Sequence, residues 1–588
     1  MNRGISKLVL AIVIVLVIVV AIAAIMLTRA PPQRTTPTTV ASTTPSPSPK
    51  TSPSPTPTKS PSPTRSPSLS PSPTPVKCET LTLGQPDMEP TILDPHRFYD
   101  SESGRVIRLV YEKLVDYEGS SVEKIVGVLA ERWEVSNDGK VWTFYLRKGV
   151  KFHDGTSFNS TAVVVSWNRF MYIYNTTGEG AGWLFADIVD KVEAVDTYTV
   201  KFVLKQPVPD FLARMAALWG FYVVSPTCIE KHKTADDPWA TKWLHEHECG
   251  TGPYVLKEWK HHQYIILEKF DDYWRGWKDK PAGYICKVVI KEITETATLK
   301  LALLKGEIDM VLGGTTYEDI PVFKKRKDIV VYENPSFNVL YVFFNTKKPP
   351  LDNLKVRQAL SYAVNYEEMV KVVLLGHGKP MKGPLPSSMP GWDPNVPMYT
   401  YDLDKAVSLL KEAGLEGKEV KLVYAYVQGD ETERKVGELL KRYFEALGEK
   451  AGVKITVELQ PMTWDTLYNL VMGGEPENAP DMAALYWWPD YVDPVDYFFP
   501  MFHSEGSYNF AHLSDSKLDE MIDKASVELD KAKRAELIKE IQKRIVELAP
   551  AVFCFELDQI DVARANVHGY VYNPLFILTV NAYDMWKS

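Results

Sequence analysis

The sequence lacks the short motifs that common catalytic and nucleotide-binding sites require. It contains no G-x-S-x-G nucleophile elbow, no H-E-x-x-H zinc motif, no P-loop and no EF-hand loop. It has five cysteines among 588 residues, and no repeat with a period of about 20 to 50 residues. These absences disfavour a catalytic function and exclude a repeat architecture.

Acidic residues are also absent from the first 78 residues, although lysine and arginine occur there. The net charge of the whole chain is −8, so the remainder of the chain is more acidic than the total indicates. Phosphate recognition requires a basic face. The acidic body therefore argues against nucleic acid as a partner.

The longest uncharged apolar run, residues 8–27, lies close to the N-terminus and reads LVLAIVIVLVIVVAIAAIML. At 1.5 Å per residue a helix of this length spans a bilayer core of about 30 Å. Secretory signal peptides have shorter apolar runs and a small-residue cleavage site. Because Arg3 and Lys7 precede the run, we expect residues 1–28 to be a retained single-pass anchor with the bulk of the chain outside the cell.

Residues 29–78 contain alternating proline and serine or threonine, which cannot build a core. Such a sequence favours an extended polyproline conformation and predicts a disordered spacer on the order of 100 Å long. It is typical either of an O-glycosylated stalk or of a plain linker. Both alternatives hold the body away from the membrane.

Outside the cell, disulfides and glycans become available. Cys228 and Cys249 bracket one short segment and are the preferred disulfide pair, worth roughly 3 kcal/mol if the geometry fits. Asn159 and Asn175 begin N-x-S/T sequons and are candidate glycosylation sites.

The rest of the chain mixes strand and helix signals and is too long for one core, so at least two lobes are expected. Strands are predicted at residues 141–150, 197–204, 264–270, 285–293, 339–345 and 420–426. Helical periodicity appears at 356–364, 365–376 and 402–414, and a long charged helical region at 515–548. This mixture predicts α/β or α+β lobes.

Two short patterns invite a metal hypothesis. In HEHEC, His245, His247 and Cys249 would share one face of a strand, as soft metal ligands do. Asp490, Asp493 and Asp496 have a spacing that carboxylates around calcium use. The disulfide is the better use of Cys249, and the second loop contains a proline and lacks a glycine turn, so no metal site is predicted.

The stretch LYWWPDYVDP, residues 485–494, sets four aromatic rings around one carboxylate, Asp490. One interpretation is a core strand that stops at Pro489, with Asp490 capping the next element. The other is a cleft wall whose rings exclude water around the acid. Because an unpaired buried carboxylate is costly, the ligand of such a cleft would have to supply a positive group.

From about residue 79 to its end, the chain resembles the family 5 substrate-binding proteins of ABC transporters, the oligopeptide- and dipeptide-binding group. The resemblance rests on seven blocks in order, which are TILDPHRFYD, LAERWEVSNDGKVWTFYLRKGVKFHDGTSFNSTAVVVSWNRF, GTGPYVLKEW, LALLKGEIDMV, VRQALSYAVNYEEMV, GKPMKGPLP and WWPDYVDPVDYF. The RGIS sequence at the front also resembles the class III signals of archaeal surface binding proteins.

The resemblance implies a two-lobe, periplasmic-binding-protein-like α/β fold that closes on its ligand by hinge motion. Lobe I is expected to be discontinuous, and an inserted domain and a third domain complete the body. The implied segments are lobe I at 79–124, 246–338 and 551–588, inserted domain II at 125–245, and lobe III at 339–550.

The resemblance also implies a receptor rather than an enzyme, without cofactor or metal, that delivers its ligand to an ABC permease. In peptide binders of this family the acid of the W-x-x-D-Y block holds the peptide amino terminus, which assigns that role to Asp490. The implied pocket wall is formed by Trp464, Trp487, Trp488 and Tyr491.

Trp488 and Pro489 replace the small residues that usually precede the acid. Sugars stack on such rings, so an oligosaccharide of the β-glucoside or cello-oligosaccharide type remains the alternative ligand. A secreted hydrolase that uses two acids is the remote third hypothesis.

Overall fold

The structure, a computed structural model, describes residues 77–86 and 89–588. The predicted anchor, and the predicted linker apart from Lys77 and Cys78, lie outside these residues. Within the part that is described, no helix has the length and apolar character needed to cross a membrane.

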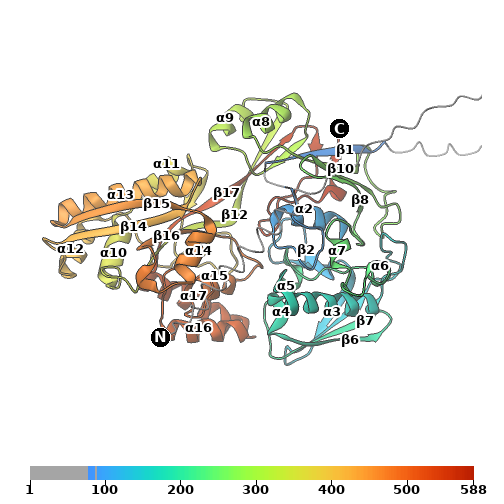
Figure 1. The fold of residues 1–588 in the computed structure, drawn as a ribbon, viewed down its shortest axis with the longest axis horizontal. Helices are drawn as coiled ribbons and strands as arrows, with labels where there is room; N and C mark the ends of the chain where they lie inside the picture. The colour runs from blue at the N-terminus through green and yellow to red at the C-terminus, as the bar shows by residue number, and fades with distance from the viewer. Residues whose placement is uncertain (1–76, 87–88) are drawn as a thin grey trace, which may run out of the picture. The chain divides into compact units, whose positions relative to one another are not determined.

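One mixed sheet of eleven strands runs through the described chain (Figure 1). Its central pairings are antiparallel, whereas β14 pairs in parallel with β15 and β16, and β1 with β10 and β11. In spatial order the strands are β15 (Lys454–Met462), β14 (Glu419–Val427), β16 (Met482–Trp487), β12 (Ile329–Phe344), β17 (Ala551–Arg564), β11 (Met310–Leu312), β1 (Glu79–Gln85), β10 (Ile285–Glu292), β9 (Tyr264–Lys269) and β8 (Tyr254–Lys260), with β13 (Gly378–Pro380) paired to β17.

A second, four-stranded antiparallel sheet is formed by an earlier part of the chain. Its strands in spatial order are β4 (Ala130–Val135), β5 (Val141–Leu146), β7 (Thr199–Leu204) and β6 (Val189–Asp196). Two separate two-stranded ribbons are formed by β2 (Val115–Tyr117) with β3 (Ile125–Gly127), and by β18 (Val567–His568) with β19 (Trp586–Lys587).

Helices flank both sheets (Figure 1). Those before β12 are α2 (Ser101–Val110), α3 (Ser160–Thr177), α4 (Trp183–Ala186), α5 (Phe211–Ala216), α6 (Pro226–His232), α7 (Thr241–Leu244), α8 (Thr296–Lys305), η1 (Tyr317–Asp319) and α9 (Ile320–Lys324). Those after it are α10 (Leu354–Ala363), α11 (Tyr366–Val373), α12 (Leu403–Glu412), α13 (Glu431–Ala451), α14 (Trp464–Met472), η2 (Pro476–Asn478), α15 (Val495–Phe502), α16 (Ser516–Val527), α17 (Lys531–Leu548) and η3 (Ala582–Asp584).

The long strands β12 and β17 join the two ends of the large sheet (Figure 1). Strand β12 is open along its first part, where residues 330–335 are exposed or half-buried, and it is buried from Val339 onward. Strand β17 is buried towards both ends and leaves residues 557–559 half-buried. Their pairing is interrupted between Pro335 and Val339. The two ends of the sheet are therefore linked by a thin stretch with little core of its own.

The predicted mixture of strands and helices is confirmed, and strands occur at all six predicted places. The helical region predicted at 515–548 consists of two helices, α16 and α17, separated by residues 528–530. Asp530 caps α17, because its side chain accepts hydrogen bonds from the backbone N–H groups of Ala532 and Lys533. HEHEC does not form the strand on which its three candidate ligands would share a face. His245 directly follows helix α7, and the His247 ring bonds to the Trp243 carbonyl.

Two disulfides fasten the described chain. One joins Cys228 to Cys249, the pair preferred from the sequence, and holds α6 to the segment after α7. The other joins Cys78 to Cys286, beside the pairing of β1 with β10. Cys554 is buried and free.

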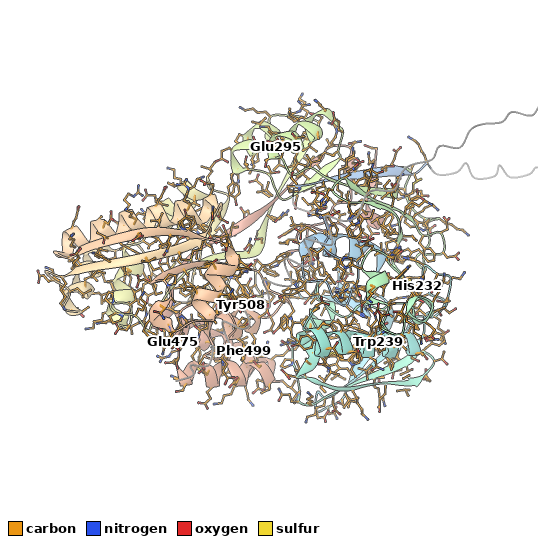
Figure 2. All side chains as sticks on the ribbon, in the orientation of Figure 1. His232, Trp239, Glu295, Glu475, Phe499 and Tyr508 are labelled. Carbon is orange, nitrogen blue, oxygen red and sulfur yellow. A yellow bond between two sulfur atoms is a disulfide. The ribbon has the colours of Figure 1, made fainter. Side chains whose placement is uncertain are left out.

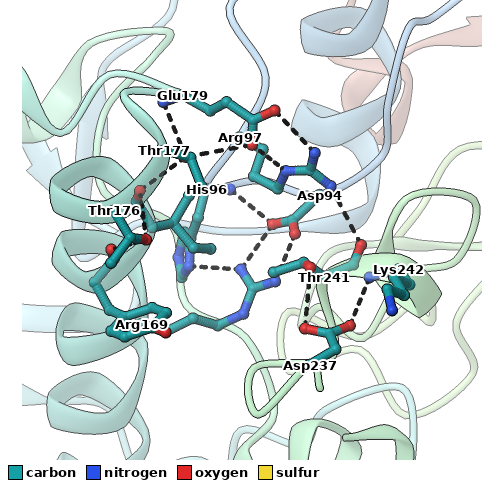
Figure 3. A network of polar contacts seen from close by, with 12 residues as sticks. Asp94, His96, Arg97, Arg169, Thr176, Thr177, Glu179, Asp237, Thr241 and Lys242 are labelled. Carbon is teal, nitrogen blue, oxygen red and sulfur yellow. Dashed lines mark hydrogen bonds and ion pairs between the residues drawn. The ribbon is translucent and has the colours of Figure 1, made fainter. Parts of the chain in front are cut away.

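A buried ion pair anchors the TILDPHRF segment to helix α3 (Figure 3). The side chains of Asp94 and Arg169 are fully buried, and Arg169 donates to both carboxylate oxygens, 2.7 Å from Oδ1. Burial raises the pKa of Asp94, but the charge and hydrogen bonds of Arg169 outweigh it and lower the pKa below its usual value. Burial and the same arginine lower the pKa of His96 to about 3, so its ring stays neutral.

Arg169→Met should destabilise the protein by about 3 to 5 kcal/mol, because it leaves the Asp94 carboxylate buried without its cation. Urea unfolding measures the loss. The matched control is Arg97→Met, which breaks the pair with Glu179, whose side chain is 43% exposed, and should cost about 1 kcal/mol or less. Equal losses in the two variants would contradict a dominant role for the buried pair.

Candidate functional site

The ring-rich stretch begins in the middle of the large sheet. Strand β16 lies between β14 and β12 and is buried along most of its length. It ends at Trp487, and Pro489 cannot donate to a continued ladder. The strand part of the first interpretation is thus confirmed. The capping part is wrong, because Pro494 occupies the N-cap of α15 and no side chain caps that helix.

The carboxylate of Asp490 is buried in the loop that follows, where the residue is only 7% exposed. The Tyr99 hydroxyl donates a hydrogen bond of 2.6 Å to its Oδ1. The backbone N–H of Asp490 donates to Oδ2 of Asp496 at 2.6 Å. The carboxylate therefore has a polar partner that comes from the other end of the chain, and no direct path into bulk water.

Burial raises the pKa of Asp490 to about 6, and the Tyr99 hydrogen bond, the Arg214 charge and Trp219 limit the rise. Burial, followed by the nearby Asp490 charge, raises the pKa of Asp496 well above its ordinary value. Both neighbouring carboxyl groups therefore have a pKa above the usual value for aspartate, and burial is the main cause in each.

Aromatic rings extend from this carboxylate along one side of the loop. Trp487 and Tyr491 are buried, and Trp488 is half-buried, with an indole N–H that has no hydrogen-bond partner among the described residues. Tyr508, labelled in Figure 2, packs edge-on against Trp487 with ring centroids 5.1 Å apart. Trp464 is 40% exposed and contacts the rings of Tyr468 and Phe510, and Tyr468 in turn contacts Tyr508.

Three residues that sequence reasoning missed complete the site on its opposite side. Tyr99 is 49% exposed and packs against Trp183 and Trp219, with ring centroids 6.5 Å and 5.0 Å away. Tyr99 does lie within the TILDPHRFYD block, which was the one available signal. Nothing in the local pattern around Trp183 or Trp219 distinguishes them from core aromatics.

Arg214 of helix α5 is a cation that contacts this loop directly. It donates to Asp210 at 2.9 Å and to the Tyr491 hydroxyl at 2.7 Å, and its guanidinium lies 4.1 Å from the centre of the Tyr491 ring. Such a contact combines hydrogen bonding with a cation–π interaction. It links the segment beside the four-stranded sheet to the loop that carries Asp490.

The same loop forms part of the wall of a hollow of about 550 Å³. Val492, Asp493 and Pro494 line one side, together with residues of α17. The opposite side comes from the four-stranded sheet region and includes Trp142 and Val208. An open space between two parts of the fold therefore adjoins the ring-rich stretch.

Neither metal hypothesis is supported. Asp493 pairs with Arg534 at 2.8 Å and Asp496 accepts from the backbone of Asp490, so these acids already have partners. Among the described residues, neither the three aspartates nor HEHEC brings its donor atoms close enough to hold one ion.

The two sequon asparagines lie on helix α3 or at its start. Asn159 caps the helix through its side-chain oxygen, and Asn175 is exposed near the other end. Glycosylation at both remains a prediction.

Comparison with known proteins shows which family the chain resembles over most of its length. A family model described as "Bacterial extracellular solute-binding proteins, family 5 Middle" matches residues 124–509. The chain is 32% identical to the dipeptide-binding protein of Escherichia coli strain K12, over 84% of this chain and 91% of that protein. It is 30% identical to the probable D,D-dipeptide-binding periplasmic protein DdpA of the same organism, over 85% and 93%.

Solved structures share the fold. The periplasmic binding protein DppA of Helicobacter pylori, in complex with the peptide STSA, superimposes with a TM-score of 0.70 at 25% identity, covering 87% of this chain and 98% of that one. The periplasmic-binding-protein-like α/β fold expected from the sequence is therefore confirmed for the described residues.

Asp490→Asn should stabilise the unliganded protein near pH 7.5 by about 1 to 3 kcal/mol, because each unit of raised pKa corresponds to about 1.4 kcal/mol. The pKa of Asp490 is about 6 in the fold, so its ionisation costs stability as pH rises through the interval between the unfolded and folded values. The gain should vanish near pH 4, where the wild-type carboxyl is protonated in the fold. Urea unfolding at both pH values tests this, and a variant less stable than wild type near pH 7.5 would contradict it.

Proposed function

The chain belongs to the family 5 extracellular solute-binding proteins, and from this premise we propose that it captures dipeptides or oligopeptides outside the cell through the Asp490 carboxylate. It is a binding receptor of an ABC importer and not an enzyme. The proposed recognition is an ion pair between Asp490 and the peptide amino terminus.

The observation that carries this proposal is a buried carboxylate without a cation of its own. Among the described residues no lysine, arginine or histidine forms an ion pair with Asp490, and the neighbouring Arg214 is paired with Asp210. A charge in that setting is costly until a partner arrives. A peptide ammonium supplies the missing charge, and the surrounding rings both exclude water and offer cation–π contacts.

The site is built from parts that a hinge can separate. Tyr99 belongs to the predicted first segment of lobe I, and Asp490 to predicted lobe III, 391 residues further along the chain. We infer that residues 330–335 of β12 and residues 557–559 of β17 form the hinge, with lobes bounded as predicted. Closure would then be driven by ligand contacts made on both sides at once.

A peptide fits better than an oligosaccharide. Two of the relatives are named for dipeptide binding, and a neutral sugar would leave the Asp490 charge without a counterion. Trp488 and the more distant Trp464 remain candidate wall residues for the peptide side chains. Peptide backbones would be held by main-chain hydrogen bonds, which tolerate many sequences.

We further infer that residues 1–28 anchor the protein in the cell membrane and that residues 29–78 form a spacer. The support is the uncharged run at 8–27 and the proline-rich composition after it. A tethered receptor stays close to the membrane subunits of its permease, which raises their effective concentration for each other.

Calorimetry with a free dipeptide on the detergent-solubilised full chain tests the anchor. Asp490→Asn should lose about 3 to 5 kcal/mol of binding free energy, by analogy with breaking a buried ion pair. Asp465→Asn removes an exposed acid on α14 and should leave the affinity unchanged. N-acetylation of the dipeptide should cost wild type about as much as the Asp490 substitution. Unchanged affinity in Asp490→Asn would refute the assignment.

Peptide affinity should also fall on acidification. Because the pKa of Asp490 is about 6 in the unliganded fold, one proton must leave before the ammonium can bind below that pH. The dissociation constant should therefore rise by up to about tenfold for each pH unit below 6. In Asp490→Asn the weaker residual binding should show no such slope. A wild-type slope equal to that of the variant would contradict the proposal.

A further inference from the structure

A second cluster of chemically active side chains lies away from Asp490, at the β8–β10 edge of the large sheet. Glu89 follows β1, His261 and His262 form the turn between β8 and β9, and Glu292 ends β10. We propose that Glu89, His262 and Glu292, here called the edge cluster, bind one divalent transition-metal ion of the zinc class. This proposal does not depend on the peptide site.

The distances within the edge cluster suit a single ion. His262 Nδ1 lies 3.5 Å from Oε1 of Glu89 and 3.9 Å from Oε2 of Glu292, and the donor atoms all lie within 4.8 Å of one another. Zinc binds histidine nitrogen and carboxylate oxygen at about 2.0 to 2.2 Å, which places tetrahedral ligand atoms about 3.3 to 3.6 Å apart. Small side-chain movements therefore bring the three donors onto one ion.

The charge of the edge cluster also calls for a cation. The side chains of Glu89 and Glu292 are only 18% and 14% exposed, and within residues 77–86 and 89–588 neither forms an ion pair with a lysine or arginine. Oε2 of Glu292 is buried and has no hydrogen-bond partner in the same residues. A buried carboxylate oxygen without a partner carries a desolvation cost, and a metal ion would remove it.

Hydrogen bonds from neighbouring residues hold the proposed metal-ligating side chain of Glu89 in position. Oε2 of Glu89 accepts from the Trp259 indole at 2.9 Å and from the backbone N–H of His262 at 3.1 Å. The ring of His261 lies 3.2 Å from the same carboxylate. His262 adopts a left-handed turn conformation with φ of 58°, which aims its ring back at the acids. Supporting hydrogen bonds of this kind orient metal ligands in known sites.

The edge cluster offers one imidazole nitrogen and two carboxylate groups, and these donor atoms favour a transition metal over calcium or magnesium. Imidazole suits zinc, nickel and copper, whereas calcium and magnesium prefer oxygen ligands alone. An ion bound there would connect the segment after β1, the β8–β9 turn and the end of β10. The predicted consequence is a firmer sheet edge and a higher unfolding temperature when zinc is present.

The test is zinc chloride titration of the metal-stripped, detergent-solubilised full chain by calorimetry, together with thermal unfolding. We expect one zinc ion per chain and a rise in unfolding temperature. His262→Ala and Glu292→Gln should each weaken zinc binding at least tenfold and abolish the thermal shift. His568→Ala is the matched control, because the ring of this histidine bonds to the Ser588 hydroxyl and lies tilted beside Trp586, and His568 is not part of the edge cluster.

Absence of zinc binding in wild type would overturn the proposal, and so would equal zinc affinity in wild type, His262→Ala and Glu292→Gln. Both variants should retain wild-type dipeptide affinity in the calorimetric assay described for Asp490. The zinc site and the peptide site can therefore fail independently, and circular dichroism of each variant confirms that it is folded.

Discussion

One buried carboxylate constrains the arrangement of the described structure. Asp490 lies at the end of a central strand, with Tyr99 as its direct hydrogen-bond partner and Arg214 close enough to moderate its pKa. Charge removed from water must be compensated, and the protein compensates it only in part. In the proposed function, this remaining deficit makes the site selective for a positively charged group, and the same deficit is the reason for the expected gain in stability of Asp490→Asn.

The side chains around this carboxylate depend on distant supports. Tyr99 belongs to a segment whose position is set by the buried pair of Asp94 with Arg169 (Figure 3). The loop that carries Asp490 continues from β16, which is clamped between β14 and β12. A fully buried ion pair on one side and a central strand on the other therefore fix the two halves of the hydrogen bond between Tyr99 and Asp490.

The segments that carry Tyr99 and Asp490 are also connected through the large sheet. Strands β12 and β17 pass from the end that contains β16 to the end that contains β1, and the register of their pairing shifts between Pro335 and Val339. A connection with a small core can bend at low cost, because few packed contacts must be broken. We therefore propose that the same two strands keep the parts of the site in one unit and serve as the hinge about which the lobes close on a ligand.

The sequence by itself determined the mixed α/β class, the strands with alternating apolar residues and the break at Pro489, since each is a local pattern. It also supplied Asp490 as a candidate ligand-binding residue, through a family block. Only the tertiary structure decided which residues meet Asp490. Tyr99 lies 391 residues away, and no periodicity reports a contact across that distance. The Cys78–Cys286 disulfide and the edge cluster have the same origin, because sheet pairing brings together segments whose spacing in the chain carries no signal.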